Sequence, residues 1–340
     1  MIDRAFAIAR RLARPMTPVG VTPATTVHRE NKWRLLRYDA RQEGTAFKTP
    51  IVLVPSLINR HYVLDLMKDK SFVQWLVARG HDVYCIDWGT PTDEDRFVTF
   101  EDIADHSIGR AISVACRLSR AEKAHVLGYC LGGTLAVIHA AIRPERIATL
   151  TLLATPVAFH DEGLLSRWTR VSTFDLRALV DAMGNVPWQL MQSAFHMLRP
   201  TMTAAKAVGM LDRAWDDEFL DGFFALETWG NDNVSFPGAA YETYVEELYR
   251  KNALIQGQLK LGPHKVSLAA ITRPTLVITF EHDSIVPWQS AAAAMDAISS
   301  KDKHRMHLSG GHVGAVVSKK AAKGLWPAIA KFWEDRDAIR

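Results

Sequence analysis

The sequence predicts an α/β fold with a mostly parallel central sheet and an inserted, mainly helical cap. Short apolar runs rich in β-branched residues alternate with helical stretches, which suits strands buried on both faces of a parallel sheet. One run leads through a glycine-rich turn into a helix. Between residues 155 and 274 the runs stop for well over a hundred residues. Connections inside such sheets usually take about 2 to 6 residues, so an insertion is expected there.

The composition is that of a soluble globular protein. The chain has 340 residues, of which 48% are apolar and 23% charged, enough for one large α/β domain carrying an insertion or for two domains of ordinary size. Its 41 basic and 37 acidic side chains leave a net charge of +4. This charge is too small to indicate a nucleic-acid partner, although it is compatible with an anionic substrate.

Neither a membrane span nor a disulfide framework is indicated. The longest apolar stretch, Ile147–Phe159, falls short of the roughly 20 residues that cross a bilayer. Arginines interrupt the apolar residues of the N-terminus, unlike in a secretory signal. Cys85, Cys116 and Cys130 are widely spaced and form no C-x-x-C pair. We therefore expect a reduced, cytoplasmic protein without a zinc site.

The pattern divides the chain into three parts. An N-terminal segment, residues 1–32, begins with a short amphipathic basic helix over residues 1–14, expected to pack on the surface. Contact of this helix with a partner or a hydrophobic inclusion surface is the alternative. The α/β core comprises residues 33–155 and 265–340, and the cap is the insertion 156–264.

Six apolar or alternating runs are predicted to form strands of the sheet: Ile51–Val54, Val83–Ile86, Ala124–Leu127, Ala148–Leu153, Thr275–Phe280 and Arg305–Leu308. The cap is rich in tryptophan and methionine on segments with helical spacing. We expect most of these side chains to be core and some to line an adaptable apolar passage. They are Trp168, Trp188, Trp215, Trp229, Met183, Met191, Met197, Met202 and Met210.

The segment Gly128–Gly133, with the sequence Gly-Tyr-Cys-Leu-Gly-Gly, follows a predicted strand and opens a predicted helix over Thr134–Ala141. This order of strand, tight turn and helix is that of a nucleophile elbow, here with Cys130 in place of serine. Side chains at positions 128 and 132 would collide with the neighbouring helix or strand. Cys85 and Cys116, which lack such flanking glycines, are expected to be small buried apolar residues.

A nucleophile on such an elbow is followed along the chain by an acid after a late strand and a histidine after the last strand. Asp283 follows the run Thr275–Phe280, with Glu281 as a rival acid. His312 follows the last predicted strand and is the expected base. The alternative histidines are His282, His304 and His307.

Two backbone N–H groups are expected to bind an oxyanion. Leu131, directly after the nucleophile, supplies one, and Ile58, in the loop after the first core strand, supplies the other. The chain lacks a G-x-x-x-x-G-K-[ST] loop, an H-E-x-x-H pair and a G-x-G-x-x-G fingerprint, so no metal or nucleotide cofactor is indicated.

At Gly128–Gly133 the chain resembles the lipase-box variant of the polyhydroxyalkanoate synthases, in which cysteine stands for serine. Pro55–Leu66 is similar to that family's oxyanion loop, and Tyr84–Gly89 to the end of its next strand. Trp229–Asp232 with Pro237–Gly238 resembles its cap. The resemblance thus includes both the predicted sheet and the predicted insertion.

This resemblance implies an α/β-hydrolase fold and an acyltransferase that polymerises (R)-3-hydroxyacyl groups, such as 3-hydroxybutyryl, with release of coenzyme A (CoA). It implies a covalent acyl-Cys130 intermediate and no cofactor, because CoA is part of the substrate. The short N-terminus resembles synthases whose catalytic subunit works with a separate helical subunit. A homodimer in the cytoplasm, at the surface of polyester granules, is expected.

In the expected mechanism His312 deprotonates Cys130, and the Leu131 and Ile58 amides hold the oxyanion. The acceptor hydroxyl would be deprotonated by His312 or, as the resemblance allows, by Asp283. Two rival functions remain: a cysteine-dependent hydrolase, such as a thioesterase or depolymerase, and a non-catalytic granule-associated protein.

Overall fold

The computed structural model describes residues 2–39, 44–198 and 202–337. Its centre is an eight-stranded sheet in the order β1-β2-β4-β3-β5-β6-β9-β10. The β1–β2 and β2–β4 pairs are antiparallel and the other pairs are parallel. The strands are β1 Ala24–Glu30, β2 Trp33–Tyr38, β3 Ile51–Val54, β4 Val83–Asp87, β5 Ala124–Tyr129, β6 Ile147–Leu153, β9 Thr275–Phe280 and β10 Lys303–Leu308.

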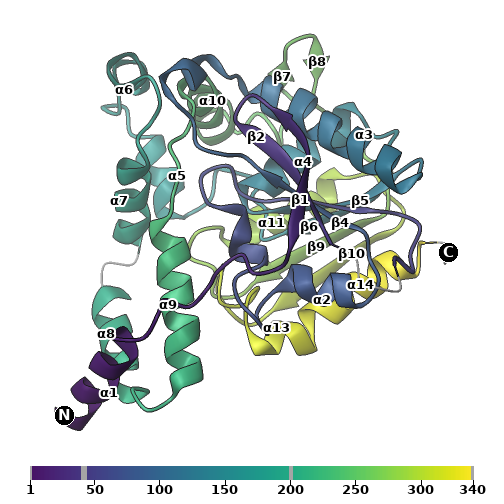
Figure 1. Ribbon diagram of the computed structural model, residues 1–340. Helices are drawn as coiled ribbons and strands as arrows, with labels where there is room; N and C mark the ends of the chain where they lie inside the picture. The colour runs from purple at the N-terminus through teal and green to yellow at the C-terminus, as the bar shows by residue number, and fades with distance from the viewer. Residues whose placement is uncertain (1, 40–43, 199–201, 338–340) are drawn as a thin grey trace.

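Helices cover both faces of the sheet because its strands are apolar on both sides (Figure 1). Along β3, Val52 and Val54 belong to one core cluster, whereas Ile51 and Leu53 belong to the other. This alternation follows from the two-residue period of a strand. The first cluster includes residues of α3 Ile108–Ser119 and α4 Leu131–Ile142. The second includes residues of α2 Phe72–Ala78, α13 Lys319–Lys323 and α14 Leu325–Glu334.

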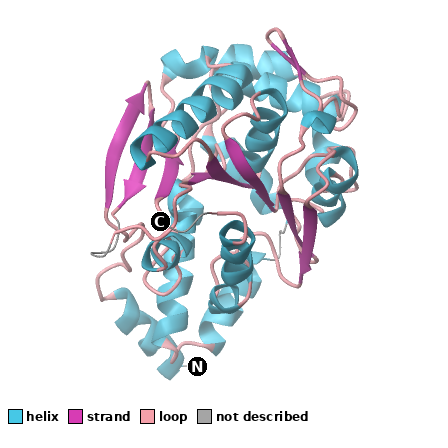
Figure 2. Cartoon of the chain, turned by 90° about the vertical axis from the view of Figure 1, so that its right-hand side faces the viewer, coloured by secondary structure: helices cyan, strands magenta, loops and turns pink. Residues whose placement is uncertain are grey.

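The insertion between β6 and β9 is mainly helical, as predicted. It forms a layer beside the sheet, and its α8–α9 end extends beyond the core (Figures 1 and 2). Its helices are α5 Leu164–Thr169, α6 Leu176–Met183, α7 Trp188–Leu198, α8 Met202–Asp212, α9 Asp217–Asn231, α10 Gly238–Thr243 and the π-helix η4 Tyr244–Arg250. A small hairpin, β7 Lys260–Leu261 and β8 His264–Lys265, lies between η4 and β9; the short helices α11 Trp288–Ala292 and α12 Ala294–Ala297 follow β9.

The tryptophans and methionines of the cap are not mostly core, which corrects the prediction. Of the eight whose side chains are described, Trp229 is buried, Met183, Met197 and Trp215 are exposed, and Trp168, Trp188, Met191 and Met210 are half-buried. The side chain of Met202 lies outside the described residues. The physical reason is that a large part of the cap surface faces solvent. No residue of α7 is buried.

The N-terminal helix α1 Ile2–Leu12 packs on the cap. Ala7 and Ile8 form a small cluster with Ala214, beside Met210 and Leu211. Three arginines of the segment pair with acidic residues of the cap: Arg4 with Asp212, Arg11 with Asp221 and Arg14 with Asp217. The expected surface packing is therefore present, and its partner is the cap.

Strands β1 and β2 were not predicted. Strand β1, Ala-Thr-Thr-Val-His-Arg-Glu, is an edge strand with no fully buried residue, so it shows no apolar run. It lies within residues 1–32, the predicted N-terminal segment, yet it pairs with β2 in the central sheet. None of the helices in the described ranges is long and apolar enough to cross a bilayer.

Candidate active site

Cys130 stands at the turn between β5 and α4 with a backbone φ of 55°. Residues other than glycine rarely adopt this left-handed region, and such strain concentrates at functional sites. The turn is held because Cys130 N–H donates to the Leu153 carbonyl at 3.0 Å. A Cβ at Gly132 would meet the carbonyl oxygens of Val54 and Pro55, which confirms the predicted steric need for glycine there.

Gly128 is required for the same reason. A Cβ at this position would meet the backbone of Gly132 and Gly133 in the first turn of α4. The glycines therefore allow the helix to begin directly against the end of β5. Cys85 and Cys116 are fully buried within β4 and α3, as expected for structural cysteines.

The loops after β9 and β10 bring Asp283 and His312 together. His312 Nδ1 lies 2.6 Å from Asp283 Oδ2, and both residues are buried. The other carboxylate oxygen of Asp283 accepts the backbone N–H groups of Ile285 and Val286 at 2.9 and 2.8 Å. His312 is fixed further by Tyr129, whose ring stacks on the imidazole and whose hydroxyl donates to the His312 carbonyl at 3.1 Å.

Cys130 and His312 share a side-chain hydrogen bond, so the thiol, the imidazole and the carboxylate form one chain of contacts. Burial alone would lower the pKa of His312. The charges of Cys130 and Asp283 outweigh this and raise the pKa of His312 to about 10. At neutral pH the imidazole is therefore protonated, and its two ring nitrogens face the Cys130 sulfur and the Asp283 carboxylate.

The rival residues lie elsewhere. Glu281 and His282 are exposed and face each other at 3.8 Å. His304 pairs with Asp302, and His307 Nδ1 lies 2.9 Å from the Thr279 hydroxyl. The structure thus brings together Cys130, Asp283 and His312 and none of their alternatives.

Protonation of His312 should make the stability of the protein depend on pH. Folding raises its pKa from 6.5 to about 10, so the folded chain keeps a proton that the unfolded chain releases. The stabilisation is complete below about pH 6.5 and is lost as the pH rises towards about 10. In denaturant titrations, the excess in unfolding free energy of the wild type over His312→Gln should shrink across this window. An excess that grows with pH would contradict the assignment.

The two predicted oxyanion donors line the space above Cys130. Leu131 N–H lies at the first residue of α4, and Ile58 N–H lies in the loop after β3. Within the part of the chain that the structure describes, neither amide donates to a protein acceptor. Amides at a helix start that have no internal partner are suited to binding negative charge.

A cavity of about 190 Å³ lies over Cys130 and is almost entirely apolar. One side, the sheet wall, is formed by loops at the carboxyl ends of β3, β5, β6 and β9. The sheet wall consists of Ile58, Cys130, Leu131, Pro156, Ile285 and Val286. The other side, the cap wall, comes from α5, α7, α10, η4 and the loop after α5, and includes Trp168 and Met191. These two residues line an apolar cavity, and the adaptable passage predicted for some of the cap side chains stays a prediction.

The sequence did not reveal the three tyrosines of the cap wall, Tyr241, Tyr244 and Tyr249. The hydroxyl groups of Tyr244 and Tyr249 lie 3.3 Å apart, both on the π-helix η4. Burial raises the pKa of all three phenols, so they stay neutral. The only signal for these tyrosines would have been the π-helix, because π-helices are rare overall but are often found at functional sites. A π-helix leaves no simple pattern in a sequence.

One group in the described part of the chain has the spacing to share a metal ion: Glu101, Asp105 and His106. None of the three lines the cavity over Cys130. Asp105 is already paired with Arg143 at 3.0 Å.

Comparison with known proteins agrees with this geometry. Residues 49–317 match the family model described as alpha/beta hydrolase fold. An esterase from Thermogutta terrifontis superposes with a TM-score of 0.57 at 17% identity, covering 93% of this chain and 98% of that one. A hydrolase from Pseudomonas aeruginosa gives the same TM-score and identity, covering 93% and 99%. Fold and site define an enzyme of the α/β-hydrolase class with cysteine on the elbow.

More specific matches identify the family. Residues 5–76 match the model described as the N-terminus of poly-beta-hydroxybutyrate polymerase (PhaC). The poly(3-hydroxyalkanoate) polymerase subunit PhaC of Allochromatium vinosum is 35% identical over 93% of this chain and 90% of its own length. That of Haloferax mediterranei is 34% identical over 99% and 69%. The chain belongs to the poly(3-hydroxyalkanoate) polymerase family, whose members are acyltransferases, and the predicted resemblance is confirmed.

Proposed function

We propose that the chain polymerises short-chain (R)-3-hydroxyacyl groups, such as 3-hydroxybutyryl, through a covalent intermediate on Cys130. The observation that carries this proposal is the contact chain Cys130–His312–Asp283 beneath an apolar cavity. The Cys130 sulfur attacks the thioester carbonyl, and the amides of Leu131 and Ile58 hold the oxyanion. The bond to the CoA sulfur then breaks, the departing CoA thiolate takes the proton of His312 and leaves as the thiol, and the acyl group stays on Cys130.

In the second half of the cycle the 3-hydroxyl of another acyl unit attacks the acyl-Cys130 thioester. Its proton passes to a base, an ester bond forms, and the Cys130 sulfur is released. His312 is the better supported base for this step. Asp283 already uses both oxygens for His312 and two backbone amides, and its side chain is only 1% exposed.

The apolar cavity supports transfer over hydrolysis, because a synthase must keep water from a thioester that a hydrolase would cleave. Its volume of about 190 Å³ suits a short acyl group. Pockets for drug-sized ligands are larger, at about 300 to 1,000 Å³. The proposed chemistry calls for no metal or organic cofactor, since CoA arrives with the substrate.

The decisive experiment is to incubate the purified protein with 3-hydroxybutyryl-CoA while following thiol release and the mass of the product. Cysteine-dependent CoA release with oligomeric ester is the expected result. Release with monomeric hydroxy acid alone would indicate a cysteine hydrolase instead. Absence of any thiol release, alone or with a helical partner subunit, would support a non-catalytic granule-associated protein.

We also propose a homodimer that works with a separate helical accessory subunit at the surface of cytoplasmic polyester granules. The support is the family and the predicted type of synthase. The dimer is tested by light scattering. The accessory subunit is tested by whether a co-expressed helical subunit copurifies with the chain and increases polymer yield, and granule association by fluorescence microscopy of the tagged chain.

A further inference from the structure

The loop that carries the Ile58 amide lies between the sheet and the cap. It leaves β3 at Val54 and ends in a short 3-10 helix, His61–Leu64. At its start, the Pro55 carbonyl accepts the indole N–H of Trp88 at 3.0 Å and touches the glycine position 132 of α4. The beginning of the loop is therefore fixed to the sheet.

The rest of the loop is held by the cap, at the turn that follows α9. Val234 N–H donates to the Ile58 carbonyl at 3.2 Å, and Asn59 pairs with Asn233 as an isolated antiparallel bridge. The indole N–H of Trp229 donates to the Arg60 carbonyl at 2.9 Å. The peptide unit next to the Ile58 amide thus takes its position from residues about 170 positions away in sequence.

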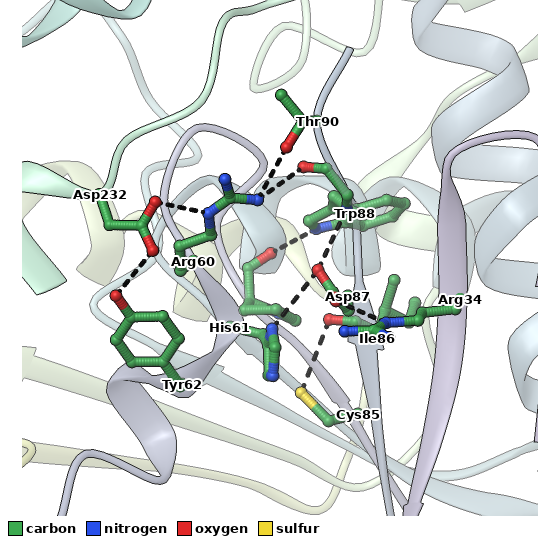
Figure 3. A network of polar contacts seen from close by, with 12 residues as sticks. Arg34, Arg60, His61, Tyr62, Cys85, Ile86, Asp87, Trp88, Thr90 and Asp232 are labelled. Atoms are coloured by element: carbon green, nitrogen blue, oxygen red, sulfur yellow. Dashed lines mark hydrogen bonds and ion pairs between the residues drawn. The ribbon is translucent and has the colours of Figure 1, made fainter. Parts of the chain in front are cut away.

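Asp232, in that turn, binds two side chains of the loop. The Asp232 carboxylate accepts Arg60 Nε at 2.9 Å on one oxygen and the Tyr62 hydroxyl at 2.8 Å on the other (Figure 3). Arg60 uses a second nitrogen to donate to the Gly89 carbonyl at 3.2 Å and to Thr90 Oγ1 at 3.1 Å, beyond the end of β4. Asp232 therefore joins the loop to the cap, and Arg60 joins both to the sheet.

These contacts are poorly placed to add stability. The side chains of Arg60 and Asp232 are 24% and 42% exposed, and ion pairs at such sites contribute on the order of 0 to 1 kcal/mol. These contacts matter more for where they hold the loop than for the stability that they add. An oxyanion donor acts only when it lies about 2.7 to 3.1 Å from the developing charge, and losing one costs about 10²- to 10³-fold in rate.

We propose that Asp232 is a positioning residue for acyl transfer: by holding Arg60 and Tyr62, it sets the Ile58 N–H at the place where the thioester oxyanion forms. This inference rests on the proposed function of Ile58 and Cys130. It makes the docking of the cap a condition for a complete oxyanion site, since Asp232, Asn233 and Val234 all belong to the cap.

The test compares two reactions of the same sulfur. Acylation of Cys130 by 3-hydroxybutyryl-CoA passes through an oxyanion, whereas alkylation by iodoacetamide forms none. In Asp232→Ala, single-turnover acylation should slow by about 10-fold or more, because the donor is displaced and not deleted. Alkylation should not slow. Asp232→Asn, which keeps one acceptor oxygen, should show a smaller loss.

The matched control is Glu227→Gln, which removes the Lys206–Glu227 ion pair from α9, the helix that precedes the turn of Asp232, at a similar exposure. It should change neither rate by more than about 2-fold, as is usual for surface pairs. Equal slowing of acylation and alkylation in Asp232→Ala, or no slowing of either, would overturn the proposal. Failure of the wild type itself to form acyl-Cys130 would instead refute the proposed function.

Discussion

Cys130→Ala should release no CoA from 3-hydroxybutyryl-CoA above the uncatalysed rate. Losing the nucleophile of a working catalytic unit costs on the order of 10⁶-fold in kcat. The reason is structural: Cys130 is the sulfur on the strained elbow, in contact with His312 and open to the cavity. Mass spectrometry of the intact protein after brief exposure to substrate should show an acyl adduct on the wild type and none on the variant.

Cys116→Ala provides the matched control, because Cys116 is fully buried in α3 away from the cavity. This variant should retain the adduct and lose only stability, by about 1 kcal/mol for a small cavity. An acyl adduct that persists in Cys130→Ala would eliminate Cys130 as the nucleophile and would require a search for another acceptor.

Asp283→Asn should slow acyl transfer by about 10⁴-fold, the effect seen when the acid of a comparable serine triad becomes an amide. The carboxylate holds Nδ1 of His312 and thereby aims the other ring nitrogen at Cys130. It also contributes to the raised pKa of His312, so the variant should lower that pKa as well. Stopped-flow acylation and NMR titration of the histidine ring would measure the two effects.

Glu281→Gln is the natural comparison, since Glu281 was the rival acid and precedes Asp283 by only two residues. Its side chain is 55% exposed and does not reach His312. Its rate should stay within a few-fold of the wild type. A comparable loss in both variants would show that the loop after β9, and not the Asp283 carboxylate, determines the rate.

The sequence allowed the prediction of features that depend on neighbouring residues, such as the turn around Cys130 and the apolar strands. The glycines around Cys130 are needed because the backbone of the elbow lies directly against the backbone of neighbouring segments. This requirement can be recognised in the sequence as a short glycine motif. Strand β6 and its parallel neighbours are buried on both faces and gave clear apolar runs. Strand β1 gave none because one edge of the sheet faces solvent.

Long-range contacts explain what was missed. Asp232 and Arg60 are separated by 172 positions, and no pattern within either segment shows that they meet. Most of the cap tryptophans and methionines were expected to be core because these residues usually pack inward. Trp215, which lies between α8 and α9 and is 61% exposed, shows that the cap does not bury all such residues.

The two walls of the cavity come from different parts of the chain, and this has a consequence for the material that the enzyme makes. The sheet wall holds the Cys130 sulfur and the amides proposed to bind the oxyanion, whereas the cap wall contributes side chains such as Trp168 and Met191, which would surround the proposed acyl group. Substitutions in the cap wall can therefore change which monomers enter the polyester while the bond-forming groups stay in place. On the proposed function, the monomer composition of the polyester would then depend on a few cap side chains that take no part in bond formation.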